Sequence, residues 1–456
     1  MDTRNLNPKK AVPVLLTVFL FSLIIDNGFK FLNLPIAEDL GLTATEVSLQ
    51  ATLAGILIGI GAVVYAALSD SINIRKLLII GIGFIAIGSI MGFVGQDVWP
   101  VVVAARVIQT AGLAAAETLY VIYVTKHLPE KDQKTYLGYS TACFQLSFLF
   151  GTLAGGYIAA NIAWPFMFIL ALVSVVSIPF ILKTVPDEEQ DTTDLDVLGL
   201  ACIAVFAGAL VMWTQKFNHV WLVLAIVGIV VFIWHIRTHD RALVRPEFFN
   251  PRYASCLIVV FLIYSTQLGL TVIVLPFALN GLHGMEIDQV SYLLVPGYIA
   301  GTLVGIFSGA IGKVMNSRMT MAVSLSAILG ALVISALFIN TSVAMLVVGV
   351  ILFSGGFAGM YAPLLNTAMS HIEPAKRGVA VGFYNLTINI AIPLGITYSA
   401  GLVDRLPFAE GSAGLYSAVL WVLVVIAAIG AVVFFAADRV ISAKEKRAGE
   451  VPATLA

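Results

Sequence analysis

The sequence predicts an all-α integral membrane protein with fourteen transmembrane helices. Hydrophobic residues make up 59% of the chain and charged residues only 11%, and apolar stretches long enough to span a membrane recur from end to end. Soluble domains carry about 25% charged residues, so this composition excludes an ordinary water-facing surface. About 20 apolar residues cross a bilayer as a helix, because lipid offers the backbone no hydrogen-bond partner.

The predicted spans follow one another with mostly short connections. They cover 12–37, 47–69, 77–95, 100–124, 137–160, 164–183, 197–214, 220–236, 254–279, 289–312, 319–339, 343–368, 379–403 and 413–437. Of the 25 Lys and Arg residues, 21 fall near the two chain ends and in the alternate loops that share one side. Because positive charge marks the cytoplasmic side, we predict a multi-pass protein of the cell membrane with both termini in the cytoplasm.

The chain also resembles itself at a long spacing. Gly55 matches Gly301 after 246 positions, and Gly151 matches Gly395 after 244. We therefore predict two six-helix bundles with pseudo-two-fold symmetry plus a two-helix insertion. The parts are an N-terminal bundle at 1–185, a linker with two inserted helices at 186–252, a C-terminal bundle at 253–437 and a basic cytoplasmic tail at 438–456.

Four motifs lie in the first predicted bundle. They are YAALSDSINIRKL with Asp70, Arg75 and Lys76; R-x-x-Q-x-x-G at Arg106, Gln109 and Gly112; Asp26 nine residues before Pro35; and GTLAGG with Gly151, Gly155 and Gly156. These motifs resemble those of the major facilitator superfamily, and within it the fourteen-helix drug:proton antiporters. Longer strings, such as RVIQTAGLAAAETLYVIYV and MYAPLLN, are similar to the chromosomal tetracycline exporters of Gram-positive bacteria.

The resemblance implies both a mechanism and roles for these residues. The drug, carried as a divalent-metal chelate, would exchange against protons by alternating access. Asp70, Arg75 and Lys76 would form a gating latch, and the glycines of GTLAGG would pack helices. Two features depart from the family: Thr152 stands where antiporters have proline, and 385–395 lacks the carboxylate of related tetracycline exporters.

Four charged residues are predicted at membrane depth: Asp26, Lys30, Arg106 and Glu117. A charge in lipid costs several kcal/mol unless it is paired or hydrated, so all four are candidates for proton coupling. Asp26 and Lys30 are one helical turn apart and can pair. Glu117 is our first candidate for the proton carrier, with Asp26 as a second acidic site.

Arg106 and Glu117 are eleven positions apart on one helix face, or about 16 Å. This distance is too long for a direct bond, so each side chain needs a partner on another helix or water. The alternative interpretation is that such a charge forms a permanent ion pair with its partner and only fixes helix packing.

Uncharged polar residues follow helical spacing in several spans and are candidates for substrate binding. They are Gln109, Tyr120, Tyr264, Gln267, Tyr361, Asn366, Asn385 and Asn389. Such groups can hydrogen-bond a drug rich in oxygen atoms, but they can equally join neighbouring helices.

We predict proton-coupled efflux of tetracycline or related amphipathic drugs. A proton symporter for nutrient uptake and a membrane-embedded lipid-handling enzyme are the alternatives, although the sequence has no P-loop and no G-x-S-x-G nucleophile turn. We expect no metal site and no cofactor besides the proton motive force. The expected partners are the drug, protons and the lipid bilayer, without nucleic acid, and we expect a monomer.

The predicted orientation has a direct test. Single cysteines placed near residues 4 and 447 should both react with a membrane-impermeant thiol reagent only from the cytoplasmic side, because the positive charge collects there. Labelling of the two positions from opposite sides would contradict the even number of spans.

Overall fold

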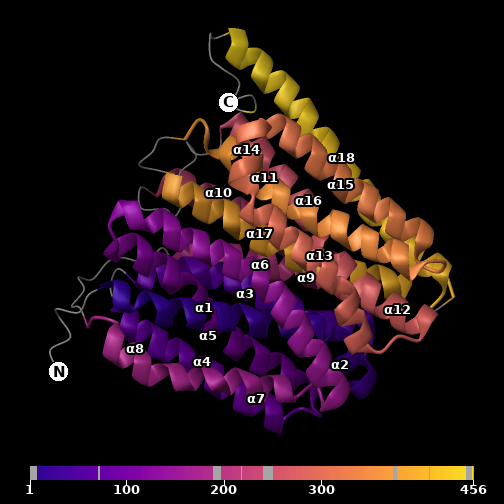
Figure 1. The fold of residues 1–456 in the computed structure, drawn as a ribbon, viewed down its shortest axis with the longest axis horizontal. Coiled ribbons are helices and arrows are strands. Elements are labelled where there is room, and N and C mark those ends of the chain that lie inside the picture. The colour runs from indigo at the N-terminus through magenta and orange to yellow at the C-terminus, as the bar shows by residue number, and fades with distance from the viewer. Residues whose placement is uncertain are drawn as a thin grey trace. The chain divides into compact units, whose positions relative to one another are not determined.

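The computed structural model describes residues 8–69, 72–187, 197–216, 218–239, 250–372, 377–409, 411–447 and 454. Every regular element in these segments is a helix (Figure 1). Among the described residues, twelve helices are long and apolar enough to cross a membrane. Shorter apolar helices cover Leu146–Asn161 and Ala201–Leu210, within the two remaining predicted spans. The prediction of an all-helical, multi-pass membrane protein is confirmed at this level.

The chain divides into two compact units, Met1–Ala204 and Val205–Ala456. The first contains η1 (Pro8–Lys10), α1 (Val12–Phe31), α2 (Asn33–Leu40), α3 (Ala44–Leu68), α4 (Ile74–Val94), α5 (Trp99–His127), α6 (Glu130–Asn161), α7 (Phe166–Leu172), η2 (Val173–Ser177) and α8 (Ile178–Thr184). Helix α9 (Val197–Lys216) crosses the division.

The second unit continues with a further series of helices. These are α10 (His219–Thr238), α11 (Pro251–Tyr264), η4 (Gly269–Val274), α12 (Leu275–His283), α13 (Ile287–Ile306), α14 (Ser308–Val314), α15 (Ser317–Phe338), α16 (Val343–Met369), α17 (Arg377–Arg405) and α18 (Ala413–Arg447). Much of the predicted linker, at 188–196 and 240–249, lies outside the described residues.

Short polar side chains set where several helices begin. Asn73 accepts a hydrogen bond from the Arg75 backbone N–H at the start of α4, and Asn316 accepts one from Met319 at the start of α15. Such N-caps satisfy backbone donors that have no partner inside the helix. At α13, Glu286 and Gln289 form a reciprocal capping box.

Two predicted spans are broken in the middle. The first ends as α1 at Phe31 and resumes as α2 after Leu32, because Pro35 has no N–H to donate to the Phe31 carbonyl four positions earlier. The ninth contains η4, a stretch of π-helix between α11 and α12. Wide π turns inside an α-helix free backbone groups and are frequent at functional sites.

Close helix crossings without room for a side chain recur in both units. In the first, a Cβ on Gly151 of α6 would lie 2.8 Å from the carbonyl oxygen of Ile24 on α1. In the second, a Cβ on Gly395 of α17 would lie 1.7 Å from the carbonyl oxygen of Ser265. The two glycines are the pair that the sequence matches at a spacing of 244 positions, so the same crossing occurs at equivalent places.

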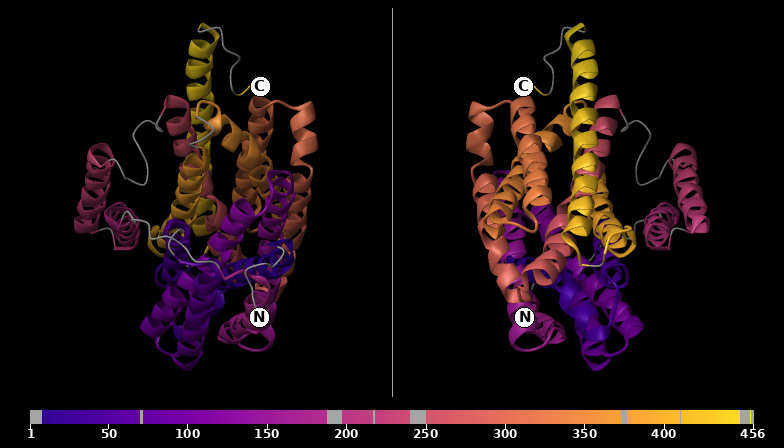
Figure 2. Two further views of the ribbon diagram at one scale, coloured as in Figure 1. Left: turned by 90° about the vertical axis from the view of Figure 1, so that its left-hand side faces the viewer. Right: turned by 90° about the vertical axis from the view of Figure 1, so that its right-hand side faces the viewer.

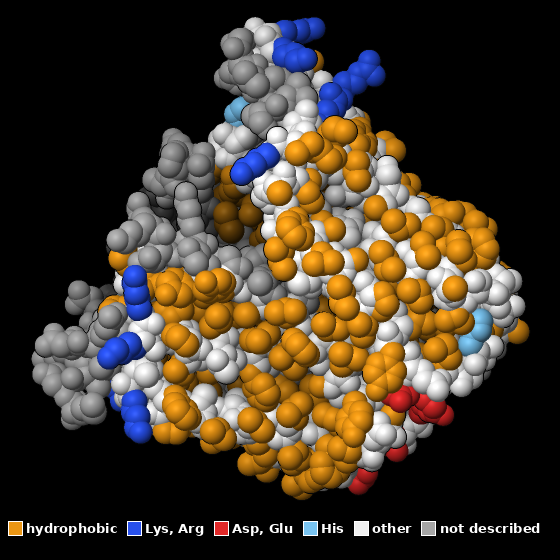
Figure 3. Space-filling model, viewed as in Figure 1, with side chains coloured by type: hydrophobic (Ala, Val, Ile, Leu, Met, Phe, Trp, Pro, Cys, Tyr) orange, Lys and Arg blue, Asp and Glu red, His pale blue; other side chains and the backbone are white. Residues whose placement is uncertain are grey.

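The outer surface is apolar. Hydrophobic side chains cover most of the face in Figure 3. Large exposed residues recur every three or four positions on single helices: Ile80, Phe84, Ile87, Ile90 and Val94 on α4, and Trp421, Val425, Ile429 and Val432 on α18. Stripes of this kind suit contact with lipid tails.

Helix α18 has 35 residues, so it is about 52 Å long, whereas the hydrocarbon core is about 30 Å thick. Figure 2 shows its C-terminal part, in yellow, extending past the other helices of the second unit. This end of α18 therefore has room for charged side chains beyond the apolar span.

Gly395→Ala tests the crossing in the second unit. The added methyl group collides with backbone rather than with a movable side chain, so we expect a loss of about 3 kcal/mol or more and little folded protein after detergent extraction. Gly382→Ala, on the same helix with nothing within 4 Å of its Cβ, is the matched control. Equal melting temperatures for the two variants would contradict the close packing.

Candidate functional site

A group of charged and amide side chains lies buried in the first unit. We call it the charge cluster; its members are Asp26, Lys30, Gln50, Arg106 and Gln109. Their residues are between 0% and 9% exposed. They come from three helices, α1, α3 and α5, which are in contact with one another.

Asp26 is the acid of the charge cluster and has two cationic neighbours. Its Oδ2 pairs with Lys30 Nζ, one turn further along α1, which confirms the pairing that the sequence predicts. Its Oδ1 lies 3.4 Å from Arg106 Nη2 on α5. Arg106 thus finds a carboxylate on another helix, as its distance from Glu117 requires.

The Arg106 guanidinium has further partners. Its Nε donates to Gln50 Oε1 on α3 at 3.1 Å, and its Nη1 donates to Gln109 Oε1. Its Cζ lies 4.1 Å from the centre of the Phe29 ring, a cation–π contact. A buried arginine needs acceptors for its five N–H groups, and this site supplies three on three helices.

Glu117 lies on α5 toward the C-terminal end, outside the charge cluster. Among the described residues, its Oε1 is buried and has no hydrogen-bond partner. Asp26 and Lys30, both on α1, are near enough to act on its charge. One turn further on, Tyr120 is fully buried; its hydroxyl donates to the Tyr136 carbonyl at 2.7 Å and its ring contacts Phe19.

Two of the residues expected to form a gate, Arg75 and Lys76, lie at the start of α4. Arg75 Nη1 is 3.8 Å from Asp187 Oδ2, and Asn73 donates to Asp187 Oδ1 at 2.8 Å. Lys76 is exposed. Asp70 lies outside the described residues. A position after α8 thus supplies a carboxylate to this loop, which the sequence did not predict.

The polar candidates of the second unit carry no charge. Tyr264 is buried against Phe357, and Gln267 has a buried Oε1 without a hydrogen-bond partner among the described residues. Tyr361 donates to Asn385 Oδ1 at 3.4 Å, and Asn389 donates to the Asn385 carbonyl at 3.0 Å. Asn366 is exposed. The structure therefore joins α16 and α17 through one of these pairs.

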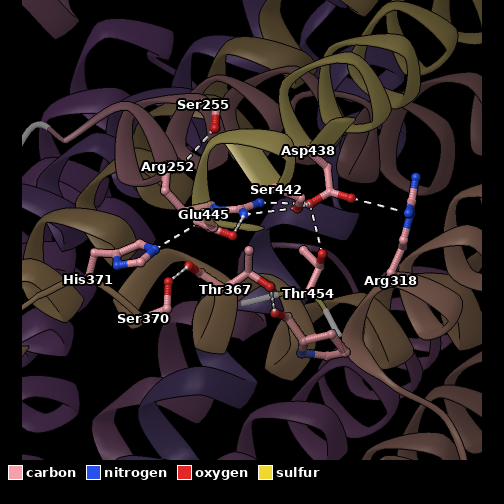
Figure 4. Close-up of polar contacts among 11 residues, drawn as sticks. Arg252, Ser255, Arg318, Thr367, Ser370, His371, Asp438, Ser442, Glu445 and Thr454 are labelled. Carbon is pink, nitrogen blue, oxygen red and sulfur yellow. Dashed lines mark hydrogen bonds and ion pairs between the residues drawn. The ribbon is translucent and has the colours of Figure 1, made fainter. Parts of the chain in front are cut away.

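The structure also contains a cluster that sequence reasoning missed. Arg252, at the start of α11, makes a bidentate pair with Glu445 through Nε (3.1 Å) and Nη2 (2.6 Å), and Nη1 lies 2.7 Å from Asp438 Oδ1 (Figure 4). His371 Nε2 is 2.8 Å from Glu445 Oε1, and Arg318 Nε is 3.3 Å from Asp438 Oδ2. We call these five residues the helix-end cluster.

The helix-end cluster ties the starts of α11 and α15 to the ends of α16 and α18. Thr454 joins it, because its hydroxyl donates to Asp438 Oδ1 at 2.8 Å and its carbonyl accepts from the Arg318 N–H at 2.9 Å. The signal in the sequence is the spacing of Asp438, Ser442 and Glu445, which places them on one face of α18.

No group of three or more His, Cys, Asp or Glu residues in the described segments is arranged to hold a metal ion. The polar contacts of the described residues are ion pairs and hydrogen bonds between helices. A membrane protein with this architecture can transport solutes. Its similarity to known proteins shows which family it belongs to.

The model of the Major Facilitator Superfamily matches residues 14–396 and 256–456. The chain belongs to this superfamily. Superfamily membership indicates a transporter rather than an enzyme, and it confirms the broader part of the resemblance read from the motifs.

Several bacterial proteins are similar to this chain in sequence. The drug efflux pump JefA of Mycobacterium tuberculosis is 24% identical over 417 residues, which are 87% of this chain and 81% of JefA. Multidrug resistance protein 3 of Bacillus subtilis is 24% identical over 379 residues, which are 78% of this chain and 73% of that protein.

Solved structures of two transporters resemble the fold. The POT family transporter PepTSo matches with a TM-score of 0.70 and 13% identity, over 94% of this chain and 98% of its own. The nucleoside transporter NupG matches with a TM-score of 0.67 and 14% identity, over 94% and 99%. At these identities the likeness concerns the fold alone.

Arg252→Met tests the helix-end cluster. The change leaves Asp438 and Glu445 buried without their shared cation, so we expect a loss of about 3 to 5 kcal/mol in stability and a lower melting temperature in detergent. Arg439→Met, at an exposed position on α18, is the matched control. A melting temperature like that of the parent would show that the cluster contributes little.

Proposed function

We propose that the chain exports an amphipathic drug, tetracycline or a related compound, in exchange for protons across the cell membrane. The observation that carries the proposal is the buried charge cluster around Asp26, Lys30 and Arg106. Burying charges within a membrane helix bundle costs several kcal/mol, and packing alone would favour apolar residues. The relatives named as drug efflux pumps and multidrug resistance proteins support the direction and the class of substrate.

In this proposal, two carboxylates carry out the coupling. Among the described residues, one oxygen of Glu117 is buried and has no hydrogen-bond partner, so this carboxylate has room to bind a proton that enters from water. Asp26 shares its two oxygens between Lys30 and Arg106, and protonation would release these cations from it. The gain or loss of a proton at either carboxylate therefore changes the net charge where α1 contacts α5.

The substrate side relies on uncharged groups. Tyr264, Gln267, Tyr361, Asn385 and Asn389 offer hydrogen bonds and ring faces from the second unit, which suits a drug rich in oxygen atoms. Asn366 adds an exposed amide. Gln109 and Tyr120 already have partners in Arg106, Ser89 and the Tyr136 carbonyl, so a drug would have to displace these bonds.

The architecture that we propose follows the one predicted from the sequence. We propose that α6 and α9 complete a set of fourteen spans, that α9 and α10 are the inserted pair, and that both termini face the cytoplasm. Asp70, Arg75 and Lys76 would act as the gate, and the transporter would work as a monomer by alternating access. The drug would travel as its divalent-metal chelate, with the metal as cargo rather than as a resident cofactor.

Glu117→Gln is the central test. The variant cannot exchange a proton at this position, so accumulation of labelled tetracycline with Mg²⁺ against its gradient in inverted vesicles should fall to the level of empty vesicles. Downhill exchange of tetracycline should remain, because the drug contacts are intact. Glu46→Gln, which alters an exposed carboxylate that caps α3, is the matched control.

Surface expression and thermal stability decide how a negative result is understood. If Glu117→Gln loses folded protein, the carboxylate has a structural role. If it keeps full proton-driven efflux, Glu117 is not the carrier, and Asp26→Asn becomes the deciding variant. Transport by the parent that ignores the proton gradient would overturn proton coupling altogether.

A further inference from the structure

Gln50 lies at the centre of the charge cluster, although no motif includes it. It is 1% exposed. Its Oε1 accepts from Arg106 Nε at 3.1 Å, and its Nε2 donates to two oxygens at 2.8 Å, the Phe29 carbonyl and Asn33 Oδ1. One amide therefore connects Arg106 on α5 to the break between α1 and α2.

The neighbours of Gln50 leave its amide a single orientation. Both partners of Nε2 are oxygen acceptors, and the partner of Oε1 is an N–H donor. A flipped amide would oppose oxygen to the Phe29 carbonyl and N–H to Arg106 Nε, losing both of these hydrogen bonds in a buried site. The carbonyl of Gln50 is thus held toward the guanidinium whatever the charge of Asp26.

Arg106 is bound more closely by neutral groups than by its acid. The Nη2–Oδ1 distance to Asp26 is 3.4 Å, longer than the 2.7–2.9 Å of a strong charge-assisted bond, whereas both glutamines and the Phe29 ring hold the guanidinium. Arg106 can therefore stay in place when Asp26 gains or loses a proton. It is a cation held at a set distance from the Asp26 carboxylate.

We infer that Gln50 is a positioning residue for the proton site. It holds Arg106 at a distance from Asp26 that sets the pH range in which Asp26 exchanges protons. The inference rests on the proposed function, in which Asp26 is a proton-exchanging carboxylate.

Two substitutions change the Arg106–Asp26 interaction in opposite directions. In Gln50→Glu, a carboxylate attracts the guanidinium away from Asp26 and adds a negative charge beside it, so Asp26 should bind its proton more tightly. The buried Asn33 Nδ2, which has no partner among the described residues, can turn to donate to the new carboxylate. In Gln50→Met, the guanidinium loses an acceptor and moves toward Asp26, which should bind its proton less tightly.

The experiment measures initial rates of proton-driven tetracycline–Mg²⁺ uptake into inverted proteoliposomes from pH 5 to pH 10. We expect the alkaline limb of the profile to move up by about one pH unit in Gln50→Glu and down by about one unit in Gln50→Met, each a tenfold change in proton affinity. Gln289→Glu, the same chemical change at an exposed capping position, should leave the profile in place.

Opposite shifts of the alkaline limb in the two variants would show that Gln50 positions Arg106. A merely structural role would lower the transport rates of both variants without moving the limb in opposite directions. If both variants keep the profile of the parent while Asp26→Asn removes the alkaline limb, the role of Gln50 is overturned and the proposed function stands. If the parent shows no proton-driven transport, the proposed function fails first. If one variant does not fold, the sign of the shift in the other still decides.

Discussion

The arrangement of the first unit depends on the free-energy cost of burying the Arg106 guanidinium inside a lipid-facing helix bundle. A side chain that is 1% exposed has little access to solvent, so each unpaired N–H group of Arg106 is costly there. Asp26, Gln50 and Gln109, on three helices, supply acceptors for three of its five N–H groups. The arrangement of α1, α3 and α5 is thus inseparable from the charge that we propose to act in coupling.

Close backbone contact is the second constraint, and it serves both units. Gly151 and Gly395 let a neighbouring helix approach until its carbonyl oxygen occupies the place of a side chain. Within the first unit this contact holds α6 against α1, the helix that carries Asp26 and Lys30. A rigid crossing beside the charge cluster keeps distances there within the few tenths of an ångström on which pairing depends.

The two units distribute charge differently. In the first, charged side chains lie within the helices at membrane depth. In the second, the described charges of α11 to α17 lie at helix ends, and the helix-end cluster gathers five of the unit's ionisable residues where four helices begin or end. This separation fits the division that we propose, in which the first unit exchanges protons and the second offers neutral groups to the drug.

The sequence by itself determined the class of the molecule, because hydropathy over span-length windows and the spacing of Asp26 and Lys30 follow from local chemistry. The spans at 100–124 and 343–368 coincide with α5 and α16 for that reason. Tertiary structure decided everything that depends on contact between distant segments. Gln50 looks like any polar residue near a helix start until α3 meets Arg106, and Arg252 is one of several loop arginines until α18 places Asp438 and Glu445 beside it. The partners of a buried polar group depend on which helices pack together, and a single sequence does not show that packing.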